Sequence, residues 1–178
     1  MNDTAERLMD LAEAHIRDAG YGGFSFRDLA AEMGIKSASV HHHFATKACM
    51  TTAVARRYRD RFFQAVAPRP GETAQGAIAT YRDVFRASLN PDNRMCLYGV
   101  LSAEAGGLSP EVAAEIKDFF QSCVIDLSKR IGGPQAEARS YNIMATLEGA
   151  MMLARSYGGI EAFDQATASL VEQRADAA

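Results

Sequence analysis

Several features that are typical of other protein classes are missing from this sequence. No apolar run approaches the roughly 20 residues that a membrane-spanning helix requires, and the N-terminal residues lack the basic stretch and following apolar stretch of a secretory signal. No alternation of apolar and polar residues predicts a β-strand. We therefore expect an all-α protein that resides in the cytoplasm and does not bind a membrane.

Cysteine is scarce, and its positions do not suit a structural role. The chain has three cysteines, Cys49, Cys96 and Cys123, which are odd in number, widely spaced and without a Cys-x-x-Cys pair. Such a set is typical of reduced thiols rather than of a disulfide framework or a zinc site. We expect no bound metal and no cofactor.

The chain also has no excess of positive charge. It carries 19 Lys and Arg residues against 22 Asp and Glu residues, a formal net charge of -3. A phosphate-binding surface needs a locally positive field whatever the total charge is. For residues 56–61 a solvated helix face is favoured over phosphate contact, which stays the alternative. The basic residues that gather in the N-terminal third are Arg27, Lys36, Lys47, Arg56, Arg57, Arg59 and Arg61.

Motifs of common enzyme classes are absent as well. The sequence contains no Gly-x-Ser-x-Gly, no His-Glu-x-x-His and no phosphate-binding glycine loop. Glu104 and Glu148 are isolated carboxylates, and their spacing implies no acid–base pair. We expect no catalytic residue and predict that the protein is not an enzyme.

What the chain does contain is a pattern of short capped helices between residues 24 and 50. Ser25 and Asp28 stand three positions apart, the spacing of an N-cap and the acidic residue that faces it. Gly34 can adopt the positive φ that ends a helix. We therefore predict a helix from about residue 26 to Met33.

A second short helix follows after a tight turn. Ser37 is the candidate N-cap, and Val40 and Phe44 lie four positions apart on one face of the helix. Two helices joined in this way form a helix-turn-helix, whose second helix can lie in the major groove of DNA. The segment therefore predicts a DNA-reading head.

The same segment resembles the N-terminal signature of the TetR/AcrR-type transcriptional regulators. His41 stands where that family usually has a tyrosine, which offers a hydroxyl to phosphate, so this contact differs here. The close match covers residues 5–60, and beyond them the resemblance is to the general helical layout of the family. The residues that carry the match are Leu29-Ala30, Gly34-Ile35, Ser37, Val40, His43-Phe44 and Lys47.

The resemblance implies an all-α fold of about nine helices in two parts. Residues 1–46 form a three-helix head with the helix-turn-helix, and residues 47–178 form a larger helical domain for effector binding and dimerisation. Helix four, at about residues 47–66, links the two parts. Apolar periodicity, interrupted by Gly and Pro, predicts the remaining helices. One helix ends near residue 89, and four more span about residues 95–105, 110–131, 134–157 and from 160 onward.

The second helix of the head and its flanks supply the candidate DNA contacts. Neighbouring side chains on a helix diverge by about 100°, so the three consecutive histidines cannot ligate one metal ion. Imidazole can instead donate to phosphate or to base edges. Lys47 lies in the first turn of helix four, where backbone amides can share a phosphate with it. The predicted DNA-binding residues are Arg27, Lys36, Ser37, Ala38, Ser39, His41, His42, His43 and Lys47.

An effector pocket in the second part is implied by the resemblance. Thioethers and aromatic rings repack around variable ligands, although the same side chains are also typical of ordinary core. The candidate pocket residues are Phe85, Cys96, Val100, Phe119, Phe120, Cys123, Tyr141, Met144 and Met151.

Cys96 has a second interpretation as a reactive thiol. The segment Met95-Cys96-Leu97 resembles the start of helix six in electrophile-responsive TetR-type repressors. A cysteine near a helix N-terminus and beside Arg94 can ionise readily, while inert packing of a small apolar thiol is the alternative. The expected effector is therefore an unidentified small molecule or an electrophile.

A homodimer follows from the geometry of recognition. One head reads one half-site, and a two-fold dimer reads a palindromic double-stranded operator. The last two helices are the expected interface, through Ala145, Gly149, Ala150, Ala154, Phe163 and Leu170.

The resemblance implies a ligand-responsive repressor, released from DNA when an effector occupies or modifies the C-terminal domain. Two alternatives stay open. One is a DNA-bound regulator without a small-molecule effector. The other is an all-helical ligand-binding protein or enzyme that retains the head.

Overall fold

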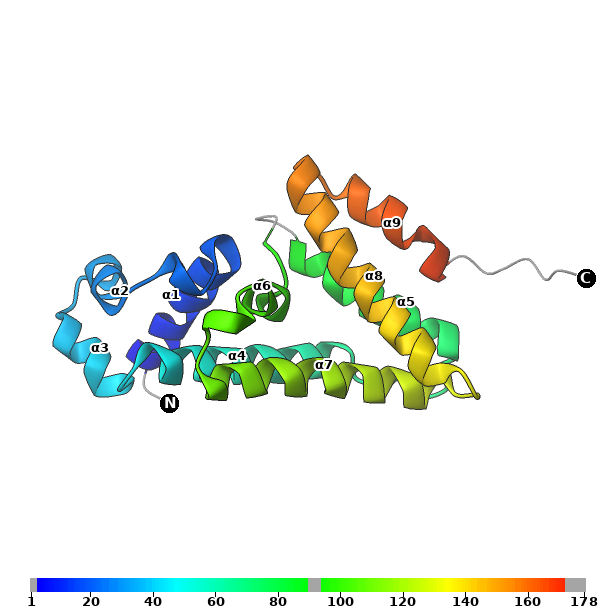
Figure 1. The fold of residues 1–178 in the computed structure, drawn as a ribbon, viewed down its shortest axis with the longest axis horizontal. Coiled ribbons are helices and arrows are strands. Elements are labelled where there is room, and N and C mark those ends of the chain that lie inside the picture. The colour runs from blue at the N-terminus through cyan, green and yellow to red at the C-terminus, as the bar shows by residue number, and fades with distance from the viewer. Residues whose placement is uncertain (1–2, 90–93, 172–178) are drawn as a thin grey trace, which may run out of the picture. The chain divides into compact units, whose positions relative to one another are not determined.

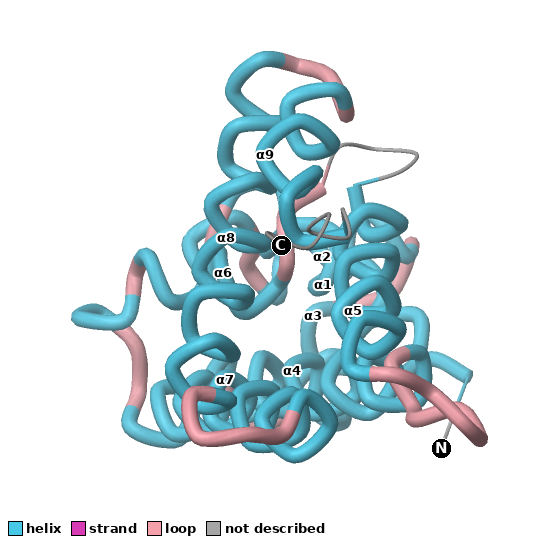
Figure 2. Tube along the Cα trace, turned by 90° about the vertical axis from the view of Figure 1, so that its right-hand side faces the viewer, coloured by secondary structure: helices cyan, strands magenta, loops and turns pink. Residues whose placement is uncertain are grey.

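Every regular element in the described part of the protein is a helix. The structure, a computed structural model, describes residues 3–89 and 94–171. Figures 1 and 2 show helices joined by loops, with no strand within these ranges, which confirms the predicted all-α class. No helix in these ranges is both long and apolar enough to cross a bilayer. The bounds are α1 (Asp3–Ala19), η1 (Tyr21–Gly23), α2 (Phe26–Met33), α3 (Ser37–His43), α4 (Lys47–Ala65), α5 (Ala74–Leu89), α6 (Leu97–Ala103), η2 (Ala105–Gly107), α7 (Pro110–Ile131), α8 (Ala136–Tyr157) and α9 (Glu161–Val171).

The chain divides into two compact units. Unit 1 comprises residues 1–61 and 97–119, and unit 2 comprises residues 62–96 and 120–178. Unit 1 therefore contains more than the three helices of the expected head, because it also takes in most of α4, all of α6 and the first part of α7. The functional boundary between residues 46 and 47 stays a prediction.

The start and end of α2 follow from the residues that the sequence places there. The Asp28 amide donates to Ser25 Oγ at 3.2 Å, and the Ser25 amide donates back to Asp28 Oδ2 at 3.0 Å, so the capping box is confirmed. Gly34 has φ 66° and donates its amide to the carbonyls of Ala30 and Ala31. Both helix ends are satisfied by local bonds, which fixes the length of α2 without help from the rest of the fold.

The start of α3 differs from the prediction. Ser37 is already helical, and Lys36 occupies the N-cap position in an extended conformation without a side-chain cap. The prediction that Ser37 caps this helix is therefore wrong by one position. Because the turn after Gly34 is one residue shorter than expected, the Ser37 side chain is exposed on the first turn of α3 rather than folded over its end.

The core of unit 1 is built on α1. Leu8, Ala12 and Ile16 lie on one helical face and are fully buried, as are Leu29 of α2 and Val40 of α3. This apolar stripe at a spacing of three to four residues is what the sequence predicts for a core-facing helix. Burial of the stripe holds α2 and α3 in place, since short helices have little stability of their own.

A second contact in unit 1 joins α6 to α7 and α4. The rings of Tyr98 and Phe119 stack with centroids 3.9 Å apart and planes 2° from parallel. The Tyr98 hydroxyl donates to the carbonyl of Ala55 at 2.8 Å, so its polar end is satisfied although the side chain is fully buried. Both residues thus belong to the packing of unit 1.

The helix before η2 is shorter than predicted. It spans Leu97–Ala103 instead of residues 95–105, and Glu104 then leaves helical geometry with φ −108° and ψ 10°. Met95 and Cys96 precede the helix and are buried. Cys96 therefore lies just ahead of α6 rather than within its first turn.

In unit 2, α5, α8 and α9 lie side by side (Figure 1). Asp164 of α9 accepts from Arg82 Nη2 at 2.8 Å and from Arg86 Nε at 2.7 Å, which ties α9 to α5. The Arg86 guanidinium, followed by that of Arg82, holds the pKa of Asp164 below its usual value. The two arginines hold α9 in place by charge. The buried side chain of Phe163, on α9 itself, holds it in place by apolar packing.

Arg130 is the centre of a second polar cluster in unit 2. Its guanidinium donates to Glu72 Oε2 at 2.6 Å, to Asp126 Oδ2 at 2.8 Å and to the carbonyl of Val66 at 2.7 Å. Tyr81 donates its hydroxyl to the same Asp126 oxygen at 2.8 Å. The arginine therefore has its charge neutralised and several of its donors used, which is what a cation in a largely buried position requires.

Candidate nucleic-acid interface and effector site

The surface of α3 carries most of the predicted DNA-binding residues. Val40 is fully buried and holds the helix on the core. Among the predicted contacts, Ser39 and His43 are half-buried. The exposed ones are Ser37, Ala38, His41 and His42, together with Lys36, which directly precedes the helix. Val40 thus holds α3 on the core, while the exposed side chains of the helix are left to face a partner.

Two ring contacts orient the histidines of α3. The His41 ring lies edge-on to Phe26 of α2, with centroids 4.9 Å apart. The rings of His42 and His43 are 5.4 Å apart in a similar edge arrangement. In the described ranges no three His, Cys, Asp or Glu side chains are arranged as metal ligands. The tyrosine position of the family signature is thus filled by a ring that packs on α2.

Lys47 occupies a different environment from the one predicted. Its ammonium donates to the carbonyl of Phe24 at 2.5 Å and lies 4.3 Å from the centroid of the Phe24 ring and 4.7 Å from that of Tyr21. Burial lowers its pKa, and the charges of Glu104 and Asp28 partly oppose that effect. In this conformation Lys47 holds the start of α4 against the loop before α2, so contact with phosphate requires the side chain to leave these partners.

The arginines of α4 are paired with carboxylates inside unit 1. Arg57 Nη1 lies 2.8 Å from Glu6, and its Nη2 lies 2.8 Å from Asp10 and 3.4 Å from Glu13, all on α1. Arg61 also pairs with Glu13. These two residues fasten α4 to α1.

Arg56 and Arg59 make the equivalent connection to α7. Their guanidinium groups lie 2.5 and 3.3 Å from the carboxylate of Glu115, whose side chain is nearly buried. The basic side chains of residues 56–61 are therefore engaged inside unit 1, which neither of the two interpretations of the sequence, phosphate contact and a solvated helix face, included. By contrast, the exposed Arg27 and Lys36 have no ion pair with any described residue, so their charges are directed to solvent.

The candidate effector residues do not form one set. Val100 and Phe119 belong to unit 1, and Phe119 is stacked on Tyr98. Tyr141 is 56% exposed on α8, which places it outside any interior pocket. Phe120 is half-buried in unit 2. The candidates that lie in the interior of unit 2 are Phe85, Cys96, Cys123, Met144 and Met151.

The interior of unit 2 also holds a carboxyl group that the sequence interpretation set aside. Both carboxyl oxygens of Glu148 are buried, and neither accepts a hydrogen bond from a described residue that meets ordinary geometry. Burial raises the pKa of Glu148 to about 7, and the nearby Cys96 thiol partly offsets the effect. Burial, with the charge of Glu148 added, also raises the pKa of Cys123. Helical spacing gave a signal here, because Glu148 stands one turn from Met144 and from Met151 on α8.

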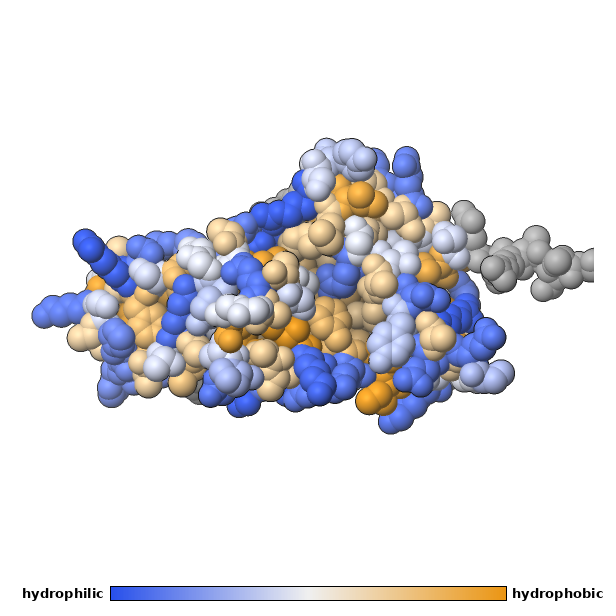
Figure 3. Space-filling view, viewed as in Figure 1, coloured by the Kyte–Doolittle hydropathy of each residue, from blue (hydrophilic) through white to orange (hydrophobic). Residues whose placement is uncertain are grey.

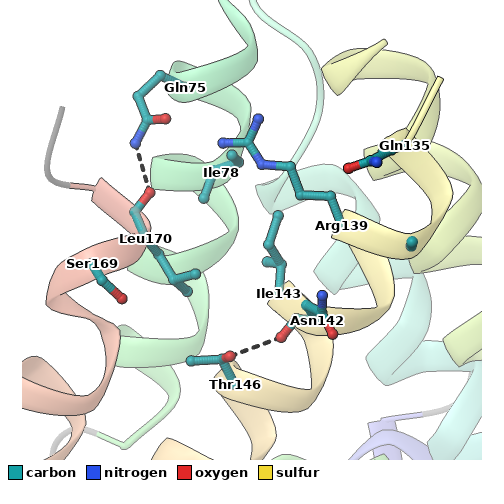
Figure 4. Close-up of a pocket in the computed structure, with 10 residues that line it drawn as sticks. Gln75, Ile78, Gln135, Arg139, Asn142, Ile143, Thr146, Ser169 and Leu170 are labelled. Carbon is teal, nitrogen blue, oxygen red and sulfur yellow. Dashed lines mark hydrogen bonds between the residues drawn. The ribbon is translucent and has the colours of Figure 1, made fainter. Parts of the chain in front are cut away.

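A cavity of about 600 Å³ lies between α5, α8 and α9, at the surface of unit 2 (Figure 4). Its larger apolar side chains are Ile78, Ile143 and Leu170, and Arg139 reaches over it from α8. Gln75 donates to the Leu170 carbonyl at 2.6 Å across one side. None of the predicted effector residues lines this cavity.

The predicted dimer residues divide between the surface and the interior of unit 2. Ala145 is exposed, and Gly149 and Leu170 are half-buried. Ala150, Ala154 and Phe163 are buried inside the unit, where a partner subunit cannot reach them without rearrangement.

Several large apolar side chains of α8 are exposed. Tyr141, Met152, Leu153 and Tyr157 of α8 are 56%, 61%, 45% and 77% exposed. Figure 3 shows hydrophobic residues interspersed with hydrophilic ones on the face that it draws, some of them adjoining one another. A concentration of exposed apolar residues along one helix is typical of an interaction surface.

Comparison with known sequences gives a match over the head. Residues 8–54 match the family described as bacterial regulatory proteins, tetR family. Over 95 residues the chain is 30% identical to the HTH-type transcriptional repressor KstR2 of Mycobacterium tuberculosis. That alignment spans 53% of this chain and only 40% of the length of the relative.

Comparison with solved structures extends over nearly the whole chain. A TetR transcriptional regulator from Legionella pneumophila has a TM-score of 0.87 at 26% identity, over 96% of both chains. A TetR family regulator from Agrobacterium tumefaciens also has a TM-score of 0.87, at 24% identity, over 94% of this chain and 95% of the other. The second likeness shows the fold alone. The chain is thus a TetR-type protein in the sequence of its head, residues 8–54, and in the helical arrangement of nearly its whole length.

Proposed function

We propose that the protein is a ligand-responsive repressor that binds a palindromic DNA operator as a homodimer and is released when an effector occupies its C-terminal domain. The observation that carries this proposal is the arrangement of α3. Val40 anchors the helix, while Ser37, Ala38 and His42 are exposed on it. A recognition helix contacts base edges through its N-terminal residues, which are exposed here. The named relative KstR2 is itself a transcriptional repressor.

We assign the phosphate contacts to two cations of the head, Arg27 and Lys36, that have no ion pair with a described residue. Arg27 and Lys36 flank the helix-turn-helix and are exposed. Phosphate contacts set the register of a protein on DNA, whereas contacts to base edges give sequence preference. The arginines of α4 are left out of this role because Glu6, Glu13 and Glu115 engage them.

The dimer forms through the exposed apolar face of α8. Tyr141, Ala145, Gly149 and Met152 follow one another at intervals of three to four residues, so they lie along one side of the helix. The small residues allow a second helix to approach, and the larger ones supply apolar area. A second copy of the chain is needed because one head contacts only one half of a palindrome.

The effector acts by shifting the population of dimers between a spacing of heads that fits DNA and one that does not. Unit 2 supports this part of the proposal with its buried and unsatisfied carboxyl group. A regulator without an effector is the alternative, and it predicts that no small molecule changes operator affinity.

Fluorescence anisotropy tests DNA binding with the DNA upstream of the protein's own gene and a scrambled duplex of equal length. Lys36→Ala should weaken binding about fivefold, roughly 1 kcal/mol for one phosphate contact, and lower the slope of log affinity against log salt by about one. The matched control is Lys117→Ala, which removes the same charge from an exposed position of α7. Equal binding by both variants would count against the assigned interface.

Analytical ultracentrifugation tests the dimer. Met152→Glu places a charge in the proposed interface and should convert dimer to monomer at micromolar concentration. Ile125→Glu makes the same change at an exposed position of α7 and should leave the dimer intact. A monomeric wild-type protein, or a dimer unaffected by Met152→Glu, would refute this interface.

A further inference from the structure

The carboxyl group of Glu148 is the most unusual polar feature of unit 2. Its oxygens each expose less than 1 Å² and have no hydrogen-bond partner among the described residues. Buried polar groups in proteins are nearly always paired, and a carboxyl group loses more than most by being left unpaired. The described residues therefore provide this buried acceptor with no N–H or O–H donor, and the weakly donating Cys96 thiol is the group that partly offsets its burial.

Sulfur-containing side chains surround this carboxyl group. The thiols of Cys96, which precedes α6, and of Cys123 on α7 are its titratable neighbours. Met144 and Met151, one turn away on α8 in either direction, are buried. Sulfur-containing side chains are polarisable, and methionine repacks easily around a guest.

Among the described residues, no basic side chain shifts the pKa of Glu148, whose shift is caused by its burial and by the Cys96 thiol. Arg82 and Arg86 are held by Asp164. Arg130 is held by Glu72 and Asp126. The positive charge that would complement an ionised Glu148 must therefore come from outside the described chain.

We propose that Glu148 anchors a small organic cation, a protonated amine or amidine carried on an apolar body, and that this is the effector site of the repressor proposed above, on which the regulatory part of the inference rests. The cation supplies the missing charge and the missing N–H donors together. Met144 and Met151 repack to admit its apolar body. An anion is excluded by the carboxylate, and a neutral alcohol supplies a donor without the charge.

The proposal predicts that binding of the cation changes the number of protons bound to the protein. Burial raises the pKa of Glu148 to about 7 in the free protein, so at pH 6 most molecules hold this carboxyl group protonated. A cation binds the ionised form, and binding at pH 6 should therefore release about one proton. Affinity for the cation should rise about tenfold between pH 6 and pH 8 as the carboxyl group ionises.

The first test measures binding with matched probes. A series of apolar amines and amidines, from butylamine to benzylamine and benzamidine, is compared with the corresponding alcohols and carboxylates by thermal shift and calorimetry at pH 8. The proposal expects the cations alone to raise the melting temperature of the wild-type protein, with no effect on Glu148→Gln. Glu137→Gln is the matched control, because Glu137 is exposed on the same helix and its variant should bind like wild type. Failure of the whole cation series to bind in preference to its neutral counterparts overturns the proposal.

Calorimetry in two buffers of different ionisation enthalpy supplies the second readout. Proton release near pH 6 that disappears in Glu148→Gln supports the anchor. Binding of amines with the same affinity and the same proton balance in both proteins overturns it, since the cation would then be held elsewhere. The fold of Glu148→Gln is checked by its circular dichroism and by retained operator binding.

Operator binding separates this inference from the proposed function. If amines bind through Glu148 and release wild-type protein from the operator, but leave Glu148→Gln bound to it, both hold. If the operator is bound and no amine acts, the regulator stands and the effector class assigned here is wrong. If amines bind through Glu148 while no specific operator binding exists, the site stands and the regulatory function is wrong.

Discussion

Replacement of Glu148 by glutamine should make the protein more stable at alkaline pH and change its stability little near pH 4. In the folded protein burial raises the pKa of this carboxyl group from 4.5 to about 7. Because the folded state binds the proton more tightly than the unfolded state, the carboxyl group favours folding below pH 4.5, and this contribution is lost as the pH rises through 7. Glutamine, which is nearly isosteric and never ionises, does not lose it.

The expected size of the effect follows from the pKa shift. One pKa unit corresponds to about 1.4 kcal/mol, so the full loss amounts to about 3 kcal/mol, most of it, about 2.5 kcal/mol, between pH 5 and pH 8.5. The neighbouring thiol of Cys123 stays protonated across this range, because burial and the charge of Glu148 raise its pKa. The difference between variant and wild type therefore reports the carboxyl group of Glu148.

Urea unfolding of both proteins at several pH values, followed by circular dichroism, measures this difference. The free energy of unfolding of the wild type should fall relative to that of the variant as the pH rises from 5 to 8.5. Glu137→Gln should run parallel to the wild type, because Glu137 is exposed. A constant difference between Glu148→Gln and wild type at all pH values would refute the reasoning, since it would mean that Glu148 titrates alike in the folded and unfolded states.

Three further substitutions test the structure elsewhere, each by thermal or urea unfolding. Ser25→Ala removes the cap of α2 and should cost about 1 kcal/mol; no loss would show that the capping box adds nothing. Gly20→Ala should cost about 1 to 2 kcal/mol, because Gly20 has φ 80° and an added methyl group would meet the carboxylate of Glu104; unchanged stability would refute that backbone conformation. Arg130→Ala removes the cation that pairs with Glu72 and Asp126 and should cost about 3 kcal/mol, whereas Arg139→Ala, at an exposed position without an ion pair among described residues, should cost under about 0.5 kcal/mol. Equal losses for the two arginines would contradict the assigned cluster.

Local features of the fold could be predicted from the sequence because their causes lie within a few residues. The cap at Ser25, the left-handed glycine at position 34 and the proline that starts α7 each act on neighbouring backbone groups. The long helices α7 and α8 end at the residues that the Gly and Pro breaks predict. The all-α class follows from such local signals.

Contacts between distant residues could not be predicted in this way. Lys47 is bonded to Phe24, 23 residues earlier, and Arg57 is bonded to Glu6, 51 residues earlier. Spacing along a helix shows which face a side chain occupies but not which carboxylate lies opposite. For that reason the sequence could not decide whether the basic residues of α4 contact phosphate or the protein itself.

Glu148 shows a different limit of the sequence pattern. A glutamate in a helix is ordinarily assigned to the solvent-facing side. On α8 the buried residues, among them Ser140, Leu147 and Ala154, follow one another at intervals of three to four residues and form one face. Glu148 directly follows Leu147 and so lies about 100° round the helix from it, at the edge of that face, where spacing alone does not decide whether a carboxyl group is buried.

The ion pairs of α4 determine where this chain can be cut and rejoined in a chimeric regulator. A junction after residue 46 would separate Glu6 and Glu13 of α1 from the arginines that engage them. A junction after residue 61 would instead separate Arg56 and Arg59 of α4 from Glu115 of α7. A graft that gives a new sequence specificity should therefore carry residues 1–61 together with residues 97–119, so that the donor supplies both partners of every pair.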